Sequence, residues 1–302
     1  MNNLIDIKNL TKDDIYTLFS TADKIRSNSK KKNNKILRGK TIANLFFENS
    51  TRTLVSFELA GKRLGAHVVN INLAKSSTAK GESLKDTIQT LQAMDIDAFV
   101  VRHSQNHIGK EIQQWLNPEI KVINAGDGNN QHPTQALLDV YTILQHKNNI
   151  EDLKISIIGD IKHSRVANSL TDILHTLGNQ NINLYGPDKL LPESSKKGII
   201  CLNMKEALNN ADVIVMLRIQ KERIADNSVP NLAKYHQDFG LNRKTLALAN
   251  HSCIVMHPGP INRDVEISSE IADNRPSVIL EQVKNGVLIR QAILARLLKP
   301  SY

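Results

Sequence analysis

The sequence alternates short, uninterrupted apolar runs with segments of helical periodicity along its whole length. Strand-sized apolar runs occupy residues 41–47, 97–102, 154–160 and 211–217, and helix-like segments lie between them. Continuous apolar strands separated by helices indicate parallel sheets that are covered on both faces. The expected fold class is therefore α/β.

A length of 302 residues exceeds the usual size of one domain. About four or five strands are expected in each half of the chain, which favours two α/β domains over a single barrel. We expect two domains, each a parallel β-sheet flanked by helices. Their predicted extents are residues 1–134, with a C-terminal helix at 285–302 packing back on them, and residues 135–284. A helix-like segment at 132–147 links the two.

Hydrophobic residues make up 40% of the chain, which excludes bulk disorder. The longest apolar runs fall well short of the ~20 residues needed to cross a bilayer, so no membrane partner is expected. The first ten residues do not resemble a signal peptide, and a cytoplasmic location is expected. Cys201 and Cys253 lie in apolar surroundings without a CxxC spacing, which predicts buried thiols. The sequence indicates no metal site.

The formal net charge of +9 raises two possibilities, nucleic-acid binding and attraction of small anions. Part of the excess comes from three lysines at residues 30–32, which are interpreted as a solvated loop. Aromatic residues make up only 4%, and no basic stretch is interleaved with them. A stacking platform for single-stranded nucleic acid is thus poorly supported, and small anions are the expected partners.

Polar and basic residues follow the predicted strands, where parallel α/β sheets bind their ligands. Taken singly, an arginine after a strand is usually a surface cation, and His132 before a proline could simply bond nearby backbone at a helix start. Several such residues converging on strand ends instead predict a receptor for a polyanion or for two adjacent anions. The cations of this set are Arg52, Arg102, Arg165 and Arg218.

The segment Ser50-Thr51-Arg52-Thr53 lies between a predicted strand and a predicted helix. The N–H groups at a helix N-terminus bind phosphate, hydroxyls add donors, and the guanidinium fork suits oxyanions. Simple capping of the helix by Ser50 or Thr51 is the alternative. The sequence contains neither GxxxxGK[ST] nor GxGxxG after a first strand, so the phosphate is expected on a small substrate rather than on ATP or NAD.

Several motifs together resemble the aspartate branch of the aspartate/ornithine carbamoyltransferase family. They are FFENSTRT, KGES, VVRH, HPTQ, GDIKHSRVANSL, MLRIQKER and MHPGPINRDVEI, and they occur in the family's order from about residue 5 to the C-terminus. STRT and HPxQ are shared by the wider family, whereas RxQKER with HPGPxNR is similar to the aspartate branch. An ornithine enzyme would carry a cysteine motif of the HCLP kind in place of residues 257–260.

The resemblance implies a function and an assembly. The implied reaction transfers the carbamoyl group of carbamoyl phosphate to the α-amine of L-aspartate, which gives N-carbamoyl-L-aspartate and phosphate in an early step of pyrimidine synthesis. The implied catalytic unit is a homotrimer with active sites shared between subunits. A regulatory chain or another chain of the pyrimidine pathway is a possible partner. The chemistry needs no cofactor and no metal.

The resemblance also implies roles for individual residues, carried over by position. The implied carbamoyl-phosphate-binding set is Ser50, Thr51, Arg52, Thr53, Ser76, Lys80, Arg102, His132, Gln135, Pro258 and Gly259. The implied aspartate-binding set is Lys80, Arg165, Arg218 and Gln220, and the implied catalytic residues are Arg52, Thr53, Lys80 and His132. Within these sets, Ser76 and Lys80 match residues that reach in from a neighbouring subunit, and the backbone carbonyls of Pro258 and Gly259 match acceptors for the carbamoyl NH2. Glu48 and Arg223 match structural supports.

One residue departs from the family pattern. Leu54 stands where the family usually has a second arginine, which could alter packing, an interface or affinity. Three rival functions stay open: a carbamoyltransferase for ornithine or a related amine, a non-catalytic binding module, and a nucleic-acid-binding protein.

Overall fold

The computed structural model of the chain describes residues 1–28, 35–72, 82–193, 197–220 and 232–299. The chain divides into two compact units. Unit 1 is Met1–Leu138 together with Val283–Tyr302, and unit 2 is Asp139–Gln282. The division falls inside two helices, α5 (Pro133–His146) and α11 (Ile279–Leu298).

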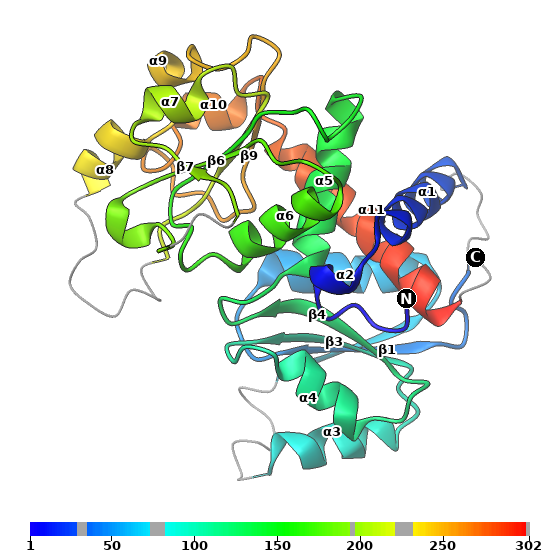
Figure 1. The fold of residues 1–302 in the computed structure, drawn as a ribbon. Coiled ribbons are helices and arrows are strands. Elements are labelled where there is room, and N and C mark those ends of the chain that lie inside the picture. Colours follow the sequence, from blue (N-terminus) through cyan, green and yellow to red (C-terminus); the bar gives the residue numbers. More distant parts are fainter. Residues whose placement is uncertain (29–34, 73–81, 194–196, 221–231, 300–302) are drawn as a thin grey trace. The chain divides into compact units, whose positions relative to one another are not determined.

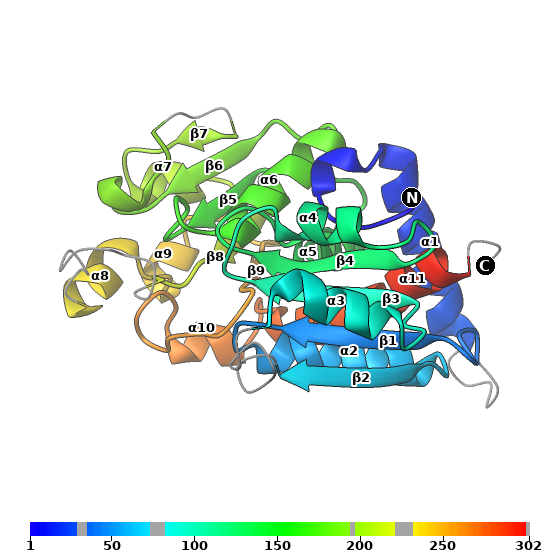
Figure 2. The same cartoon turned by 90° about the horizontal axis from the view of Figure 1, so that it is seen from below.

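Unit 1 contains a four-stranded, fully parallel sheet with the strand order β2-β1-β3-β4. Figure 2 shows these four strands side by side. The strands are β1 (Thr41–Phe46), β2 (His67–Asn72), β3 (Ala98–His103) and β4 (Lys121–Asp127). The other elements of unit 1, besides parts of α5 and α11, are η1 (Ile7–Asn9), α1 (Lys12–Asn28), α2 (Thr51–Arg63), α3 (Leu84–Gln92) and α4 (Ile108–Trp115).

Helices cover both faces of this sheet, as continuous apolar strands require. The helices α3 and α4 lie on one face, and α2 and α11 lie on the other (Figure 1). On the first face, Leu45 of β1 and Phe99 of β3 pack with Ile88 of α3 and Ile112 of α4. On the second face, α2 approaches the sheet closely, since a Cβ added at Gly61 would lie only 2.6 Å from Cγ2 of Val68.

The first helix of unit 1 follows the sequence prediction closely. The apolar face expected at residues 11–26 is buried in α1. Thr11 caps this helix, because its Oγ1 accepts a hydrogen bond from the N–H of Asp14 while the Asp14 carboxylate accepts one from the N–H of Thr11. The hydrogen bond from the Thr11 N–H is the largest cause of a lowered pKa of the Asp14 carboxyl, and the Thr11 hydroxyl lowers this pKa further by donating to the same oxygen.

Unit 2 contains a five-stranded, fully parallel sheet with the strand order β7-β6-β5-β8-β9. Its strands are β5 (Ile155–Ile158), β6 (Ile182–Tyr185), β7 (Ile199–Ile200), β8 (Val213–Met216) and β9 (Ile254–Met256). Its other elements, besides parts of α5 and α11, are α6 (Arg165–Thr176), η4 (Asp188–Leu190), α7 (Met204–Leu208), α8 (Leu232–Phe239), α9 (Arg243–Leu246) and α10 (Ser269–Asp273).

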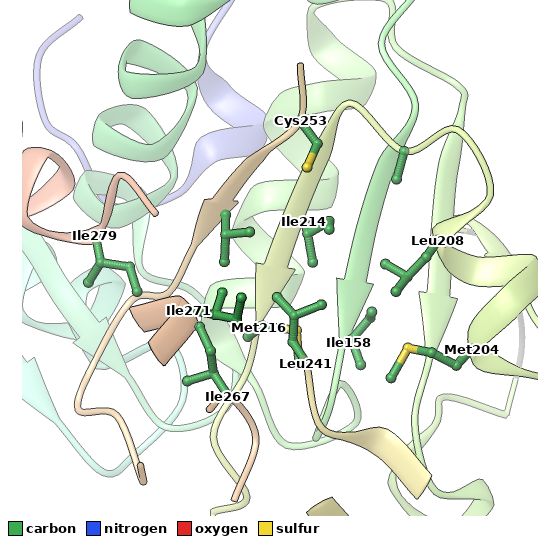
Figure 3. Close-up of a cluster of buried hydrophobic side chains, with 12 residues drawn as sticks. Ile158, Met204, Leu208, Ile214, Met216, Leu241, Cys253, Ile267, Ile271 and Ile279 are labelled. Carbon is green, nitrogen blue, oxygen red and sulfur yellow. The ribbon is translucent and has the colours of Figure 1, made fainter. Parts of the chain in front are cut away.

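The core of unit 2 forms between its sheet and the short elements that follow the strands. Figure 3 shows Ile214 and Met216 of β8 beside Ile158 of β5, with Met204 of α7 and Ile271 of α10 on the same side of the sheet. Since each short helix contributes only a few apolar side chains, the sheet supplies the continuous part of this core.

Both cysteines are buried, as the sequence predicted. Burial raises the pKa of the Cys201 thiol and of the Cys253 thiol. They are therefore expected to be protonated at neutral pH and to pack as small apolar side chains. Among the residues that the structure describes, no helix combines the length and apolar character needed to cross a bilayer.

Gly159 gives a test of how tightly the strand ends of unit 2 are packed. It follows β5 with a φ of +127°, and a Cβ at this position would overlap the backbone carbonyl oxygen of Leu217. We expect Gly159→Ala to reduce the free energy of unfolding by about 3 kcal/mol, because strain from the positive φ adds to a backbone clash. Urea unfolding of the purified chain measures the change.

Gly178 provides the matched control, since its φ is +94° but a Cβ there would make only ordinary contact, 3.4 Å from Cγ of Glu151. Gly178→Ala should reduce the free energy of unfolding by about 1–2 kcal/mol, because only the strain of the positive φ is added. Equal losses in the two variants would contradict the close approach at Gly159.

Candidate functional site

The N-terminus of α2 forms the first part of the candidate site in unit 1. Ser50 occupies the N-cap position with φ −158° and ψ 83°, and its side chain makes no capping hydrogen bond. The alternative in which Ser50 simply caps the helix is therefore wrong. No acidic residue lies in the first turn, so this end of the helix carries an uncompensated partial positive charge, which suits an anion.

The residues of this first turn differ in exposure. Thr51 and Arg52 are exposed, whereas Thr53 is buried and its carbonyl accepts a hydrogen bond from the Ser56 hydroxyl at 2.9 Å. Leu54, the residue that departs from the family pattern, is half-buried one position further along the helix. Arg52 is therefore an exposed cation in the first turn of the helix, where the backbone N–H groups have no partner within the helix.

Arg102 lies at the end of β3 and is fixed in place by contacts with the neighbouring strand ends. Its Nε lies 3.4 Å from Oε2 of Glu48, and its Nη1 donates a hydrogen bond to the carbonyl of Ala125 at 3.1 Å. The backbone carbonyl of Arg102 accepts a hydrogen bond from Phe47 N–H at 2.9 Å. These contacts hold the guanidinium plane at the strand ends and place Glu48 as its support.

The neighbouring His103 is half-buried and packs edge-on against Phe47, with 4.5 Å between the ring centroids. Burial lowers its pKa, so the imidazole is neutral at pH 7. Its Nδ1 accepts a hydrogen bond from Gln105 N–H at 2.8 Å, which places the proton of the neutral ring on Nε2. His103 therefore adds no positive charge to the site at that pH.

Asp127, the buried last residue of β4, organises the loop that leads to His132. Its Oδ2 accepts hydrogen bonds from His107 N–H at 2.6 Å and from the Asn130 amide at 2.9 Å. Its Oδ1 accepts from the Asn124 amide at 2.8 Å and from Gln131 N–H at 3.0 Å. The sequence analysis did not assign Asp127 this role, although the position of a carboxylate directly after an apolar strand was a usable signal.

His132 and Gln135 lie at the start of α5, where Pro133 takes the first helical position. Both are buried, and the His132 carbonyl accepts the N–H of Gln135 at 3.0 Å. Thr134, between them, receives a hydrogen bond at 3.3 Å from Nη2 of Arg290, a buried residue of α11.

Arg290 connects three helices of unit 1. Its guanidinium carbon lies 5.1 Å from the ring centroid of Phe57 in α2, while its Nη2 bonds Thr134 in α5. It thus contacts the middle of α2 and the start of α5, the two helices whose first turns carry predicted site residues. Sequence reasoning missed Arg290, and the usable signal was a lone arginine on the apolar face of the last helix.

In unit 2, Asp160 ties together two loops that carry predicted aspartate-binding residues. The fully buried Asp160 places Oδ1 2.8 Å from Nδ1 of His163, and its Oδ2 accepts Gln220 N–H at 3.2 Å. The Gln220 side-chain amide donates to the carbonyl of His163 at 3.1 Å. The loop after β5 and the loop after β8 are therefore held in one arrangement.

Two arginines of this region lie in those same loops. Arg165 is the buried first residue of α6, whose N-cap Ser164 accepts Ala167 N–H at 3.1 Å. Arg218 is half-buried and follows β8 by two positions. Pro258 and Gly259 follow β9, and the N–H of Gly259 donates to Nδ1 of His257 at 2.8 Å.

The structure thus places the predicted site residues at strand ends in both units. Unit 1 holds Ser50, Thr51, Arg52, Thr53, Arg102, His132 and Gln135, and unit 2 holds Arg165, Arg218, Gln220, Pro258 and Gly259. Ser76, Lys80 and Arg223 lie outside the described residues. Within the described ranges, no cluster of three or more His, Cys, Asp or Glu residues is arranged to hold a metal ion.

Comparisons with known proteins point to the same family for both halves of the chain. Residues 2–145 match a family model described as the carbamoyl-P binding domain of aspartate/ornithine carbamoyltransferase, and residues 151–297 match its Asp/Orn binding domain. The aspartate carbamoyltransferase catalytic subunit of Coxiella burnetii (strain RSA 493 / Nine Mile phase I) is 50% identical over 97% of this chain and 94% of its own length.

Two solved structures extend the comparison to the fold. Trypanosoma cruzi aspartate transcarbamoylase in complex with N-(phosphonacetyl)-L-aspartic acid has a TM-score of 0.89 at 31% identity, covering 98% of this chain and 96% of that one. Ornithine carbamoyltransferase from Pyrococcus furiosus has a TM-score of 0.87 at 25% identity, covering 100% and 98% respectively. The expected fold class of two parallel sheets with helices is confirmed.

The missing cap at Ser50 predicts a difference between two serines that both occupy N-cap positions. Ser50→Ala should change the free energy of unfolding by less than about 0.5 kcal/mol, because no hydrogen bond is lost. Ser164→Ala should cost about 1 kcal/mol, because the N–H of Ala167 loses its acceptor. Urea unfolding without added anions compares them, and a loss at Ser50 equal to that at Ser164 would restore the capping interpretation.

Proposed function

Because this chain belongs to the aspartate/ornithine carbamoyltransferase family, we propose that it functions as an aspartate carbamoyltransferase. It transfers the carbamoyl group from carbamoyl phosphate to the α-amine of L-aspartate and releases N-carbamoyl-L-aspartate and phosphate. The observation that carries this function is the 50% identity, over 97% of the chain, with an aspartate carbamoyltransferase catalytic subunit. The reaction belongs to pyrimidine biosynthesis.

Carbamoyl phosphate is held by unit 1 in this proposal, in keeping with the predicted domain at residues 1–134. Its phosphoryl oxygens accept hydrogen bonds from the first-turn N–H groups of α2, from the hydroxyls of Ser50, Thr51 and Thr53, and from the guanidinium groups of Arg52 and Arg102. The absence of a side-chain cap at Ser50 and the fixed orientation of Arg102 support these roles.

The carbamoyl group is oriented by side chains and by backbone. His132 and Gln135 bind it from the start of α5, and the carbonyls of Pro258 and Gly259 accept its NH2 hydrogens. The hydrogen bonds of Asp127 to the loop before His132 support a fixed position for the imidazole, because a buried and fully bonded carboxylate restricts the backbone around it.

Aspartate is bound by unit 2, in keeping with the predicted domain at residues 135–284. Arg165 and Arg218 face its two carboxylates, and Gln220 adds an amide donor. Asp160 supports this set by fixing the Gln220 backbone and the loop before Arg165. Two arginines for two carboxylates satisfy the charge of the substrate without a metal.

The remaining parts of the proposal concern the assembly. Ser76 and Lys80 contribute from a neighbouring subunit of a homotrimer, and Lys80 contacts both substrates. The chain acts in the cytoplasm, and a regulatory chain or another pyrimidine-pathway chain is a possible partner. Light scattering of the purified chain measures its oligomeric state, and complementation between Lys80→Ala and Arg52→Ala chains tests whether active sites are shared.

The chemistry is nucleophilic addition followed by elimination. The uncharged α-amine of aspartate forms a bond to the carbamoyl carbon, and negative charge develops on the carbonyl oxygen. Donors from Arg52, Thr53 and His132 stabilise that oxygen, and one such donor typically contributes about 3–4 kcal/mol. The C–O bond to phosphate then breaks, and the leaving phosphate takes the proton of the amine. Holding the amine and the carbamoyl carbon close together in the correct orientation lowers the barrier by up to about 7–11 kcal/mol.

A carbamoyl-aspartate assay on the purified chain tests the function directly. The wild type should form N-carbamoyl-L-aspartate from aspartate and no citrulline from ornithine. Citrulline formation instead would move the chain to the ornithine branch, and loss of both products together with absent substrate binding would refute the proposal.

Arg52 is the residue whose removal should affect the reaction most clearly in unit 1. We expect Arg52→Ala to lower kcat by about 10²–10³, because a donor to the developing oxyanion is lost. Arg63→Ala is the control, since Arg63 is exposed in the last turn of the same helix and its removal changes the net charge equally. If kcat fell equally in both variants, the loss would be due to the change in net charge and not to a specific role of Arg52.

A further inference from the structure

His257 and Glu266 form a fully buried pair in unit 2, directly after β9. Both side chains are 0% exposed, and Nε2 of His257 lies 3.1 Å from Oε1 of Glu266. The same carboxylate oxygen accepts the backbone N–H of Asn262 at 2.6 Å. Burying a carboxylate is unfavourable unless donors compensate it, so the pair is expected to serve a structural or functional purpose.

The second ring nitrogen of His257 defines its tautomer. Nδ1 lies 2.8 Å from the backbone nitrogen of Gly259, whose N–H can only donate, so Nδ1 accepts. An imidazole nitrogen that accepts carries no proton, and the ring is therefore neutral with its proton on Nε2. That proton is donated to Glu266, which as a carboxylate can only accept. Glu266 thus selects the tautomer that the Gly259 N–H requires.

This hydrogen bond also fixes the orientation of one peptide group. The peptide bond between Pro258 and Gly259 is trans, and the N–H and C=O of a trans peptide point in opposite directions. Since the Gly259 N–H points at the His257 ring, the Pro258 carbonyl points away from that ring. A ring with its proton on Nδ1 would set one donor against another and would favour rotation of this peptide group.

The main chain of His257 is anchored independently of its ring. Its backbone N–H donates to Oε1 of Gln282 at 2.9 Å, and Nε2 of Gln282 donates to Oδ1 of Asp139 at 2.8 Å. Gln282 and Asp139 are both buried. Because these contacts hold the backbone, a change of tautomer is expected to be relieved in the Pro258–Gly259 peptide rather than by movement of the strand end.

We propose that Glu266 is a positioning residue for carbamoyl-group recognition, and that it acts by holding His257 in the tautomer that aims the Pro258 carbonyl. The proposal rests on the proposed function, in which that carbonyl accepts a hydrogen bond from the carbamoyl NH2. Glu266 therefore contributes to the selection of carbamoyl phosphate over phosphate esters and anhydrides that lack an amide. It makes no contact with substrate itself.

Binding of three anions distinguishes a role of Glu266 in carbamoyl recognition from a general effect on the stability of the fold. Carbamoyl phosphate carries the NH2 group, acetyl phosphate carries a methyl group in its place, and inorganic phosphate lacks both. Glu266→Met should weaken binding of carbamoyl phosphate about five- to tenfold, the effect of one lost hydrogen bond, and should change binding of the other two by less than about twofold. Calorimetry on the intact chain measures all three.

Two further variants test whether the ability of Glu266 to accept hydrogen bonds determines the preference for carbamoyl phosphate. Glu266→Gln keeps an oxygen that accepts from His257 and Asn262, so its preference for carbamoyl over acetyl phosphate should stay within about twofold of wild type. Glu270→Met is the control, since Glu270 is an exposed carboxylate four residues away in the sequence. Loss of the preference in Glu266→Gln, or equal weakening of all three anions in Glu266→Met, would overturn the proposal.

A bypass variant tests the route through His257. In His257→Asn, the carboxamide oxygen can accept the N–H two residues further on, as in an Asx-turn. Adding Glu266→Met to His257→Asn should then alter the preference between the two acyl phosphates by less than about twofold. A further five- to tenfold loss in the double variant would show that Glu266 does not act through the ring.

The tautomer itself is measured by ¹⁵N NMR of the histidine side chains, with the His257 signals assigned by their absence in His257→Asn. The wild type and Glu266→Gln should show the Nε2–H form, and Glu266→Met should show a substantial Nδ1–H population. An Nδ1–H form in the wild type would refute the proposal. If the chain binds no carbamoyl phosphate, the proposed function fails, and the NMR result still decides whether Glu266 sets the tautomer.

Discussion

Parallel hydrogen bonding between strands is the constraint on which the rest of the structure depends. Because all strands of each sheet run the same way, their carboxyl ends lie at one edge. The register pairs Phe46 with Arg102 in unit 1 and Ile158 with Met216 in unit 2. Segments that are far apart in the sequence, such as 47–53 and 102–107, therefore begin side by side and can combine their charges.

Buried acids bond the backbone of three loop regions that follow strands. Asp127, Asp160 and Glu266 each accept hydrogen bonds from backbone N–H groups of these loops. Such carboxylates fix loop geometry by accepting hydrogen bonds from the backbone. Glu48 is different, since it contacts Arg102 directly and orients that cation. In each unit, buried acids thus bond the backbone of loops that follow strands, and the cations proposed to bind substrate lie at strand ends and helix starts.

The succession of strands and helices along the chain could be predicted from the sequence, because apolar runs and helical periodicity indicate which residues are buried. The apolar face of α1, its cap at Thr11, and the family motifs around Ser50, His132 and Arg165 were all legible. Short elements such as β7 and α7 carry too few residues to show a period. Asp127, Asp160 and Arg290 were missed, because a charged residue in a sequence indicates solvent exposure, and only coordinates reveal that its partners lie in other elements.

Unit 1 is built from two separate stretches of the chain, and this has a consequence for how it folds. Unit 2 lies between these stretches in the sequence and is continuous, so it can form its own contacts without them. Unit 1 is complete only when the second stretch returns to the first, and closing so long a loop costs conformational entropy. Arg290 lies in the returning stretch and contacts α2 and α5, so its contacts with these two helices are expected to form late in the folding of unit 1.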